Sequence, residues 1–213
     1  MKFSRHGILF VISAPSGGGK TTVVQALRKN PHLFYSVSCT TRAPRPGEIN
    51  AEHYHFLSAA DFEARIEAGH FLEHAKVHED LYGTLCEPVR TNLEKGTDVL
   101  IDIDTQGAAT IRNSDDSIVP QALADIFIMP PDVEELRRRL EKRATEKAQQ
   151  IESRLATATR EMELWRDYRY TIVSGSIEED LEKVRNIMSS ETFLSRRLMQ
   201  NDRYGCDGEK FQT

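Results

Sequence analysis

The sequence has little of what would cross-link a fold or anchor it in a membrane. Only 3 of its 213 residues are cysteines, Cys39, Cys86 and Cys206, and there is no Cys-x-x-Cys pair. Three widely spaced cysteines are poor material for a disulfide framework or a zinc cage, so we expect reduced thiols. The longest apolar run, Ile8 to Ile12, is far shorter than the ~20 residues of a membrane-spanning helix. This excludes a helical membrane span in the sequence.

Positive charge and an N-terminal targeting pattern are also scarce. The chain carries 28 Lys and Arg against 33 Asp and Glu, for a net charge of -5. A protein that binds nucleic acid over its whole surface is usually basic, so we expect no nucleic-acid partner. The first residues lack the charged and apolar regions of a signal peptide, so we expect a cytoplasmic protein with no membrane partner. The overall charge does not exclude a local basic site.

Four short runs rich in β-branched and aromatic residues predict buried strands. They lie at residues 7–13, 99–103, 125–129 and 170–173. Their hydrophobicity is continuous rather than alternating, which is typical of strands covered on both faces, as in a parallel sheet. Helical patterns lie between and after these runs. The alternation predicts an α/β fold, with a parallel-sheet core and helices on both faces.

Residues 38–97 interrupt this alternation. A polar loop rich in Pro, Arg and Gly leads to a short strand-like run and then to a helix, whose start has the capping-box pattern at Ser58 and Asp61. A second helix is expected from Pro88 to Gly96, because proline favours the start of a helix and glycine its end. This segment predicts a small inserted α+β lobe.

Two further segments differ from the core pattern. Residues 137–163 are strongly charged and helical, with more basic than acidic residues between Arg137 and Arg154. On its own, such a charge run is most simply a solvated helix surface. Residues after about 195 are polar and contain glycine, so we expect a loosely held C-terminal tail.

A glycine-rich turn follows the first predicted strand and opens a helix. Residues 14–21 match the phosphate-loop pattern Gly-x4-Gly-Lys-Ser/Thr except for Ala14. The glycines let backbone N–H groups approach phosphate oxygens, and the helix N-terminus adds partial positive charge. Lys20 can reach the β- and γ-phosphates, and the Thr21 hydroxyl can ligate Mg²⁺. The residues expected to bind nucleotide are Ala14, Pro15, Ser16, Gly17, Gly18, Gly19, Lys20, Thr21 and Thr22.

Asp102 and Asp104 lie at the end of the predicted strand 99–103, beside the expected phosphate loop. A carboxylate at this edge of the sheet can hold Mg²⁺ through water. The two side chains alternate along the strand and point to opposite faces, so we expect them to have different roles.

An arginine pair lies on the proline-stiffened loop that opens the inserted lobe. Arg42 and Arg45 are three residues apart, and two fixed guanidinium groups suit a phosphate held by paired hydrogen bonds. Tyr54 and Tyr82 could complete such a phosphate site with their hydroxyls, or they could belong to the ordinary core of the lobe.

Glu73 and Thr84 offer a carboxylate and a hydroxyl within the same lobe. Guanine presents two donors, N1–H and the exocyclic amine, beside the O6 acceptor, and this pair is complementary to them. Adenine would instead oppose its N1 acceptor to the carboxylate. A buried group left unpaired in this way strongly disfavours the wrong base.

Together, these motifs resemble the guanylate kinases over roughly residues 5–190. The resemblance rests on six motifs in the order of the family, namely residues 13–22, 37–48, the Tyr54 segment, 71–73, 82–84 and 102–107. It implies a P-loop core, a GMP-binding lobe and a mobile helical lid. The core would comprise residues 1–37, 98–136 and 164–194, the lobe 38–97, the lid 137–163 and a tail 195–213.

The resemblance also implies roles for individual residues. The GMP phosphate would be held by Ser38, Arg42, Arg45, Tyr54 and Tyr82, and guanine would be read by Glu73, Thr84 and Asp104. Lys20 and Thr21 would serve ATP and Mg²⁺, and Asp102 would hold the metal through water. Charge on the transferring phosphoryl group would be neutralised by Lys20, Arg42 and the lid residues Arg139, Arg143 and Arg154.

The implied reaction is phosphoryl transfer from ATP·Mg²⁺ to GMP, and to dGMP, with release of ADP. The partners would be these small molecules, and the protein would be a monomer or a homodimer. One alternative is a kinase for another nucleoside monophosphate, against which the pair of Glu73 and Thr84 argues. The other is a non-enzymatic guanylate-kinase-like interaction module, against which the intact Lys20 and Thr21 argue.

The sequence departs from the family pattern at two places. Ala144 stands where the lid usually has a glycine. Residues 173–176 read Val-Ser-Gly-Ser, where the family commonly has Val-Asn-Asp before the last helix. This second departure lies near the expected adenine site, so we expect a different contact there.

Overall fold

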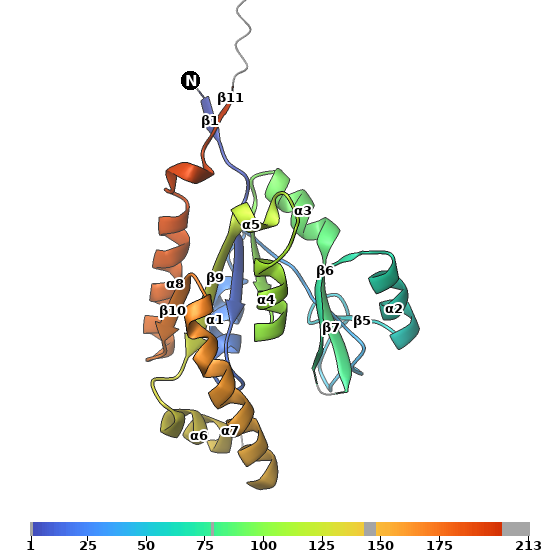
Figure 1. Ribbon diagram of the computed structural model, residues 1–213, viewed down its shortest axis with the longest axis vertical. Helices are drawn as coiled ribbons and strands as arrows, with labels where there is room; N and C mark the ends of the chain where they lie inside the picture. Colours follow the sequence, from blue (N-terminus) through green and yellow to red (C-terminus); the bar gives the residue numbers. More distant parts are fainter. Residues whose placement is uncertain (1, 78, 143–147, 202–213) are drawn as a thin grey trace, which may run out of the picture.

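The core of the protein is a five-stranded sheet in which all neighbouring strands run parallel (Figure 1). The computed structural model describes residues 2–77, 79–142 and 148–201. Along the chain, the strands of this sheet are β2 (Leu9–Ser13), β3 (Leu33–Tyr35), β8 (Asp98–Asp102), β9 (Leu123–Met129) and β10 (Tyr170–Val173). In the sheet, they lie in the order β10-β9-β2-β8-β3. The four predicted strands and the parallel α/β core are confirmed, and β3 is a strand that the sequence did not predict.

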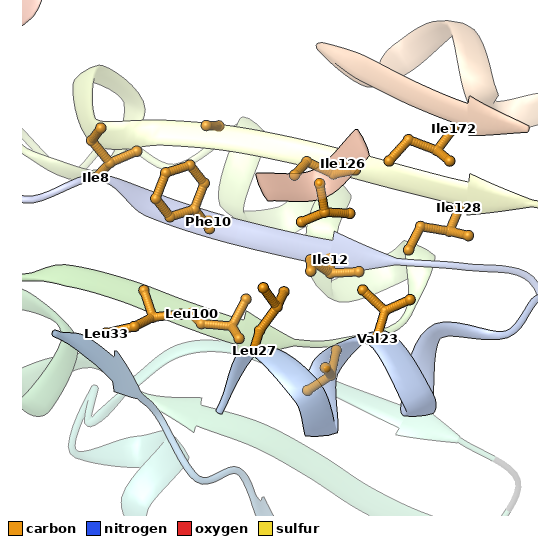
Figure 2. Packing of buried hydrophobic residues seen from close by; sticks show 13 residues of the cluster. Ile8, Phe10, Ile12, Val23, Leu27, Leu33, Leu100, Ile126, Ile128 and Ile172 are labelled. Atoms are coloured by element: carbon orange, nitrogen blue, oxygen red, sulfur yellow. The ribbon is translucent and has the colours of Figure 1, made fainter. Parts of the chain in front are cut away.

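Helices cover both faces of this sheet because its central strand, β2, buries side chains on both sides. Phe10 and Ile12 pack on the face covered by α1 (Lys20–Leu27) and α8 (Ile177–Glu191) (Figure 2). Leu9 and Val11 pack against the other face, covered by α3 (Cys86–Glu94), α4 (Thr105–Arg112) and α5 (Val119–Ala122). All four side chains are fully buried, and each contributes roughly 2 kcal/mol. None of the described helices has the length and apolar character needed to cross a membrane.

The inserted α+β lobe is a second sheet beside the core (Figure 1). Its order is β5-β4-β7-β6, with strands β4 (Cys39–Thr40), β5 (His55–Phe56), β6 (Phe71–Val77) and β7 (Asp80–Leu85), and with helix α2 (Ala59–Glu67). The antiparallel hairpin of β6 and β7 pairs Glu73 with Thr84. Ser58 caps α2 as predicted, since its hydroxyl accepts the N–H of Asp61 at 3.1 Å.

The charged segment forms two helices that pack on each other, α6 (Val133–Lys142) and α7 (Ala148–Met162). They share a small core of Leu136, Leu140, Leu155 and Ala158, which is separate from the clusters on the two faces of the sheet. A short 3-10 helix, η1 (Glu163–Asp167), then leads to β10. The helical prediction is confirmed for these residues, whereas Arg143 and Ala144 lie outside the described residues.

The C-terminal segment is anchored to the core at Arg197 and is paired with β1 as far as Asn201, so the expectation of a loosely held tail is wrong for this part. A 3-10 helix, η2 (Ser195–Arg197), leads to β11 (Met199–Asn201), which pairs antiparallel with β1 (Lys2–Ser4). Arg197 is only 8% exposed and donates to the carbonyl oxygens of Gln121 and Ala122 at 2.8 and 3.1 Å. Its Nε also donates to Oε2 of the fully buried Glu191 at 3.0 Å.

We predict that Arg197→Ala lowers the free energy of unfolding by about 3 kcal/mol, because the buried Glu191 carboxylate loses a cationic partner. Urea unfolding followed by circular dichroism measures this loss. Arg196→Ala is the matched control, since Arg196 is exposed in the same short helix and its loss should change stability by less than about 0.5 kcal/mol. Equal unfolding midpoints for the two variants would contradict the role of Arg197.

Candidate active site

The connection from β2 to α1 has a backbone that only glycine accommodates well. Gly17 and Gly19 have φ values of 86° and 101°, in the left-handed region that favours glycine. A Cβ on Gly18 would lie 2.9 Å from the side chain of Ala14. Helix α1 begins at Lys20, and among the described residues no side chain caps it. Its first N–H groups are therefore available to an anion, as the phosphate-loop pattern predicts.

Lys20 lies where the loop meets the ends of the core strands. Its Nζ donates to the carbonyl oxygen of Ile103 at 2.7 Å and forms an ion pair with Asp102. Asp102 is the last residue of β8, and it lines the same cavity as Lys20 and Thr21. The hydroxyl of Thr21 and the carboxylate of Asp102 are oxygen donors of the kind that Mg²⁺ prefers, so these residues fit the predicted metal site.

A cavity of about 490 Å³ borders the phosphate loop. One wall is made of residues 14–21, and α7 provides Ser153, Arg154, Thr157 and Glu161 on the other side. The carboxylate of Glu161 accepts the backbone N–H of Ser16 at 3.1 Å, and burial raises its pKa. The Glu161 carboxylate of α7 therefore accepts a hydrogen bond from one of the backbone N–H groups that a nucleotide phosphate would need.

A second cavity, of about 300 Å³, lies between the core strands and the lobe. It shares Lys20, Thr21 and Asp104 with the first cavity. The lobe contributes further predicted site residues to its lining, Ser38, Tyr54, Glu73 and Tyr82. The two cavities thus meet at Lys20, which is where a phosphoryl group passing from one nucleotide to another would have to lie.

The Glu73 carboxylate belongs to the lining of this second cavity. It is 5% exposed, and its Oε1 accepts the Thr84 hydroxyl at 2.6 Å. A Cβ on Gly107 would lie only 2.6 Å from its Oε2, so α4 can approach the carboxylate closely because residue 107 is glycine. Asp104 caps α4 by accepting the N–H of Gly107 at 2.8 Å. Burial raises the pKa of Glu73 to about 7, although the hydrogen bond from Thr84 opposes this rise.

The predicted phosphate-binding arginines, Arg42 and Arg45, do not line this cavity. The guanidinium of Arg42 lies 5.5 Å from the ring centre of Tyr54 and donates to Glu48 at 2.8 Å. The other carboxylate oxygen of Glu48 accepts the backbone N–H of Arg45 at 2.7 Å. Both hydrogen bonds lower the pKa of Glu48, and the one from Arg42 has the larger effect. A carboxylate of the same loop therefore holds the Arg42 guanidinium that was predicted to bind phosphate, whereas Arg45 contributes only its backbone N–H to this carboxylate.

The three arginines that were predicted to belong to a lid occupy different places. Arg154 lines the cavity beside the phosphate loop. Arg139 borders neither cavity, and its Nη1 donates to the carbonyl oxygen of Gly18 at 3.2 Å. Arg143 lies outside the described residues. The roles of Glu48, Glu161 and Gly107 were not predicted, and only the place of Glu48 and Gly107 within the family-like motifs could have drawn attention to them.

A model of the family described as guanylate kinase matches residues 6–191 of this sequence. The chain belongs to the guanylate kinase family. It is 43% identical to the guanylate kinase of Ruegeria pomeroyi over 92% of this chain and 90% of that protein. It is 41% identical to the guanylate kinase of Caldanaerobacter subterraneus subsp. tengcongensis over 90% of this chain and 91% of that protein.

A solved guanylate kinase has the same fold. The structure superposes on the crystal structure of guanylate kinase from Anaplasma phagocytophilum with a TM-score of 0.77. The match covers 93% of each chain at 33% sequence identity. The family resemblance that the motifs indicate and the P-loop α/β fold are both confirmed.

We predict that Glu73→Gln makes the free energy of unfolding less dependent on pH. Burial raises the pKa of Glu73 from its ordinary value of 4.5 to about 7, so the folded protein favours the protonated carboxyl. The wild type should therefore lose stability as the pH rises from 4.5 through 7, by about 2 kcal/mol between about pH 5 and pH 8. Glutamine can still accept the Thr84 hydroxyl but carries no charge to bury.

Urea unfolding of both proteins at the two pH values measures this difference. Glu63→Gln is the control, because Glu63 is exposed on α2 and its substitution should leave the pH dependence of the wild type unchanged. Identical pH dependence in Glu73→Gln and the wild type would show that the buried carboxyl does not titrate in this range.

Proposed function

We propose that this chain transfers the γ-phosphoryl group of ATP to GMP, and to dGMP, with the help of Mg²⁺. Membership of the guanylate kinase family makes it an ATP:GMP phosphotransferase. The observation that carries the detailed proposal is the pair of cavities that share Lys20. One lies beside the phosphate loop, and the other is lined by Glu73, whose carboxylate accepts the Thr84 hydroxyl. The first cavity would take ATP and the second GMP.

On the donor side, the loop residues Ala14 to Thr22 would bind the ATP phosphates. Backbone N–H groups at the start of α1 and the ammonium of Lys20 would face the phosphate oxygens. Glu161 would have to release the N–H of Ser16, since a carboxylate and a phosphate cannot both accept it. Thr21 and, through water, Asp102 would hold Mg²⁺, which would supply positive charge to the phosphates.

On the acceptor side, Glu73, Thr84 and Asp104 would read guanine, and Glu73 would accept its two N–H donors. The GMP phosphate would be bound by Ser38, Arg42, Arg45, Tyr54 and Tyr82. For this, Arg42 would have to exchange Glu48 for the phosphate, and both are anions that suit its planar guanidinium. Tyr54 and Tyr82 already lie against each other, with ring centres 5.9 Å apart.

Catalysis would rest on positioning and on electrostatic stabilisation, with no side-chain general base. Lys20 lies where the cavities meet, and with Arg42, Arg139, Arg143 and Arg154 it would neutralise charge that spreads over the transferring oxygens. We further propose that residues 38–97 and 137–163 close as lobe and lid over the core of residues 1–37, 98–136 and 164–194, excluding water that would hydrolyse ATP.

The remaining expectations belong to the same proposal. The protein would act in the cytoplasm on small-molecule substrates, as a monomer or a homodimer, without a nucleic-acid or membrane partner. The net charge of -5 supports the absence of a nucleic-acid partner. Residues 195–213 would be a C-terminal tail, with its first part tied to the core as described above.

ADP formation with GMP, AMP, UMP and dTMP as acceptors tests the substrate assignment. We predict that Glu73→Ala raises the KM for GMP by at least about 100-fold and leaves the KM for ATP nearly unchanged, because guanine loses the acceptor for its N–H donors. Glu67→Ala, at an exposed position of α2, is the control and should behave like the wild type. Highest activity with another acceptor would refute the assignment, and an unchanged KM for GMP would remove Glu73 from base recognition.

Lys20→Ala should lower kcat by at least about 100-fold, because the ammonium at the junction of the cavities is lost. Steady-state assays at saturating ATP and GMP measure the loss. Lys29→Ala removes an exposed lysine just after α1 and should keep full activity. If the two variants have equal kcat, Lys20 does not act on the transferring group.

A further inference from the structure

We propose that Ser174 and Asp180 are positioning residues that hold the lid residue Arg139 against the phosphate loop. The inference rests on the proposed function, in which Arg139 contributes positive charge to phosphoryl transfer. The proposed hydrogen bonds connect helix α8, through Ser174 at the end of β10, to Arg139 of α6. Neither Ser174 nor Asp180 lines the two cavities, so both would act through Arg139.

The guanidinium of Arg139 contacts the phosphate loop directly. Its Nη1 lies 3.2 Å from the carbonyl oxygen of Gly18, and a Cβ on Gly19 would lie 3.4 Å from the same nitrogen. Within α6, its Nε donates to Glu135 at 2.7 Å. Glu135 and Arg139 lie on successive turns of the same helix, so this contact orients the Arg139 side chain without tying α6 to the core.

Ser174 supplies the link to the core. It follows β10 directly, and its backbone N–H donates to the carbonyl oxygen of Met129 at 2.8 Å, which extends the pairing of β10 with β9. Its hydroxyl oxygen accepts Nη1 of Arg139 at 3.1 Å. The side chain is therefore fixed by the sheet and reaches the arginine from the core side.

Asp180 determines which way the Ser174 hydroxyl points. Oδ2 of Asp180 lies 2.6 Å from the Ser174 hydroxyl and can only accept from it, so the single hydroxyl proton is used in this bond. The lone pairs of Ser174 then face Arg139, and the hydrogen bonds run in one direction from guanidinium to hydroxyl to carboxylate. Such a chain strengthens each of its members. Asp180 is itself fixed, since its Oδ1 accepts the N–H of Gly175 at 2.9 Å.

The burial of Ser174 and Asp180 argues against a role that is confined to capping the N-terminus of α8. Asp180 is 4% exposed and Ser174 8% exposed, and a buried carboxylate is costly unless it is well paired. The N-terminus of α8 already has a complete capping box formed by Ser176 and Glu179. Ser174 and Gly175 of the network lie within the segment 173–176, where a departure from the family pattern is expected from the sequence.

Steady-state kinetics of single and double variants test the proposal. We expect Arg139→Ala to lower kcat/KM for ATP by about 100-fold. Ser174→Ala and Asp180→Asn should each lower it by about tenfold and leave the KM for GMP unchanged. In the double variant Arg139→Ala/Asp180→Asn, the second substitution should add no further loss, because Asp180 acts only through Arg139.

Two controls separate positioning from a general loss of stability. Ser176→Ala removes the N-cap of α8, two residues from Ser174, and should lower the unfolding midpoint without changing kcat/KM for ATP. Ser174→Thr keeps the hydroxyl and should retain most of the activity that Ser174→Ala loses. Circular dichroism confirms that each variant is folded before its kinetics are compared.

The outcomes distinguish failure of the inference from failure of the proposed function. A wild type that forms no ADP in the presence of GMP would overturn the proposed function. An active wild type overturns the inference if Arg139→Ala has wild-type kinetics or if Ser174→Ala and Asp180→Asn do. Losses from Arg139→Ala and Asp180→Asn that multiply in the double variant also overturn it, because the two residues would then act independently.

Discussion

The turn between β2 and α1 is the constraint on which the rest of the site depends. β2 is fully buried at the centre of the sheet, and the chain leaves it and enters α1 within the residues 14–19. The left-handed backbone of Gly17 and Gly19 makes so short a connection possible. It places the open N-terminus of α1, and with it Lys20, at the carboxyl ends of the parallel strands. Both cavities, the lobe and the charged helices are arranged around that point.

In this structure, carboxylates of the chain occupy three groups that were predicted to serve phosphate or metal. Asp102 pairs with Lys20, Glu48 holds Arg42, and Glu161 accepts the N–H of Ser16. Each of these carboxylates is an anion on a donor that suits an anion. At these three places, a substrate phosphate would exchange one negative partner for another.

Much of the fold could be predicted from the sequence, and so could many of the residues that line the two cavities, because short sequence patterns reflect local structural constraints. The continuous hydrophobic run of β2 indicates that helices cover both faces of the sheet. The residue spacing of the phosphate loop depends on a single turn of the chain. The tail could not be predicted, because Arg197 looks like a surface residue until Glu191 and the carbonyl oxygens beside it are brought together by the fold. Asp180 was missed for the same reason, since its partner Ser174 is defined only by the packing of α8 against β10.

The pairing of β1 with β11 joins the two ends of the described chain. β1 precedes β2, whereas the phosphate loop follows it, so this two-stranded ribbon lies at the opposite end of the core from the nucleotide site (Figure 1). Chain ends are where a folded protein usually frays. Within the described residues, separation of Lys2–Ser4 from the core would also unpair Met199–Asn201. Release of the C-terminal segment would in addition require the buried guanidinium of Arg197 to leave its carbonyl partners, so this end of the core is held at two independent places.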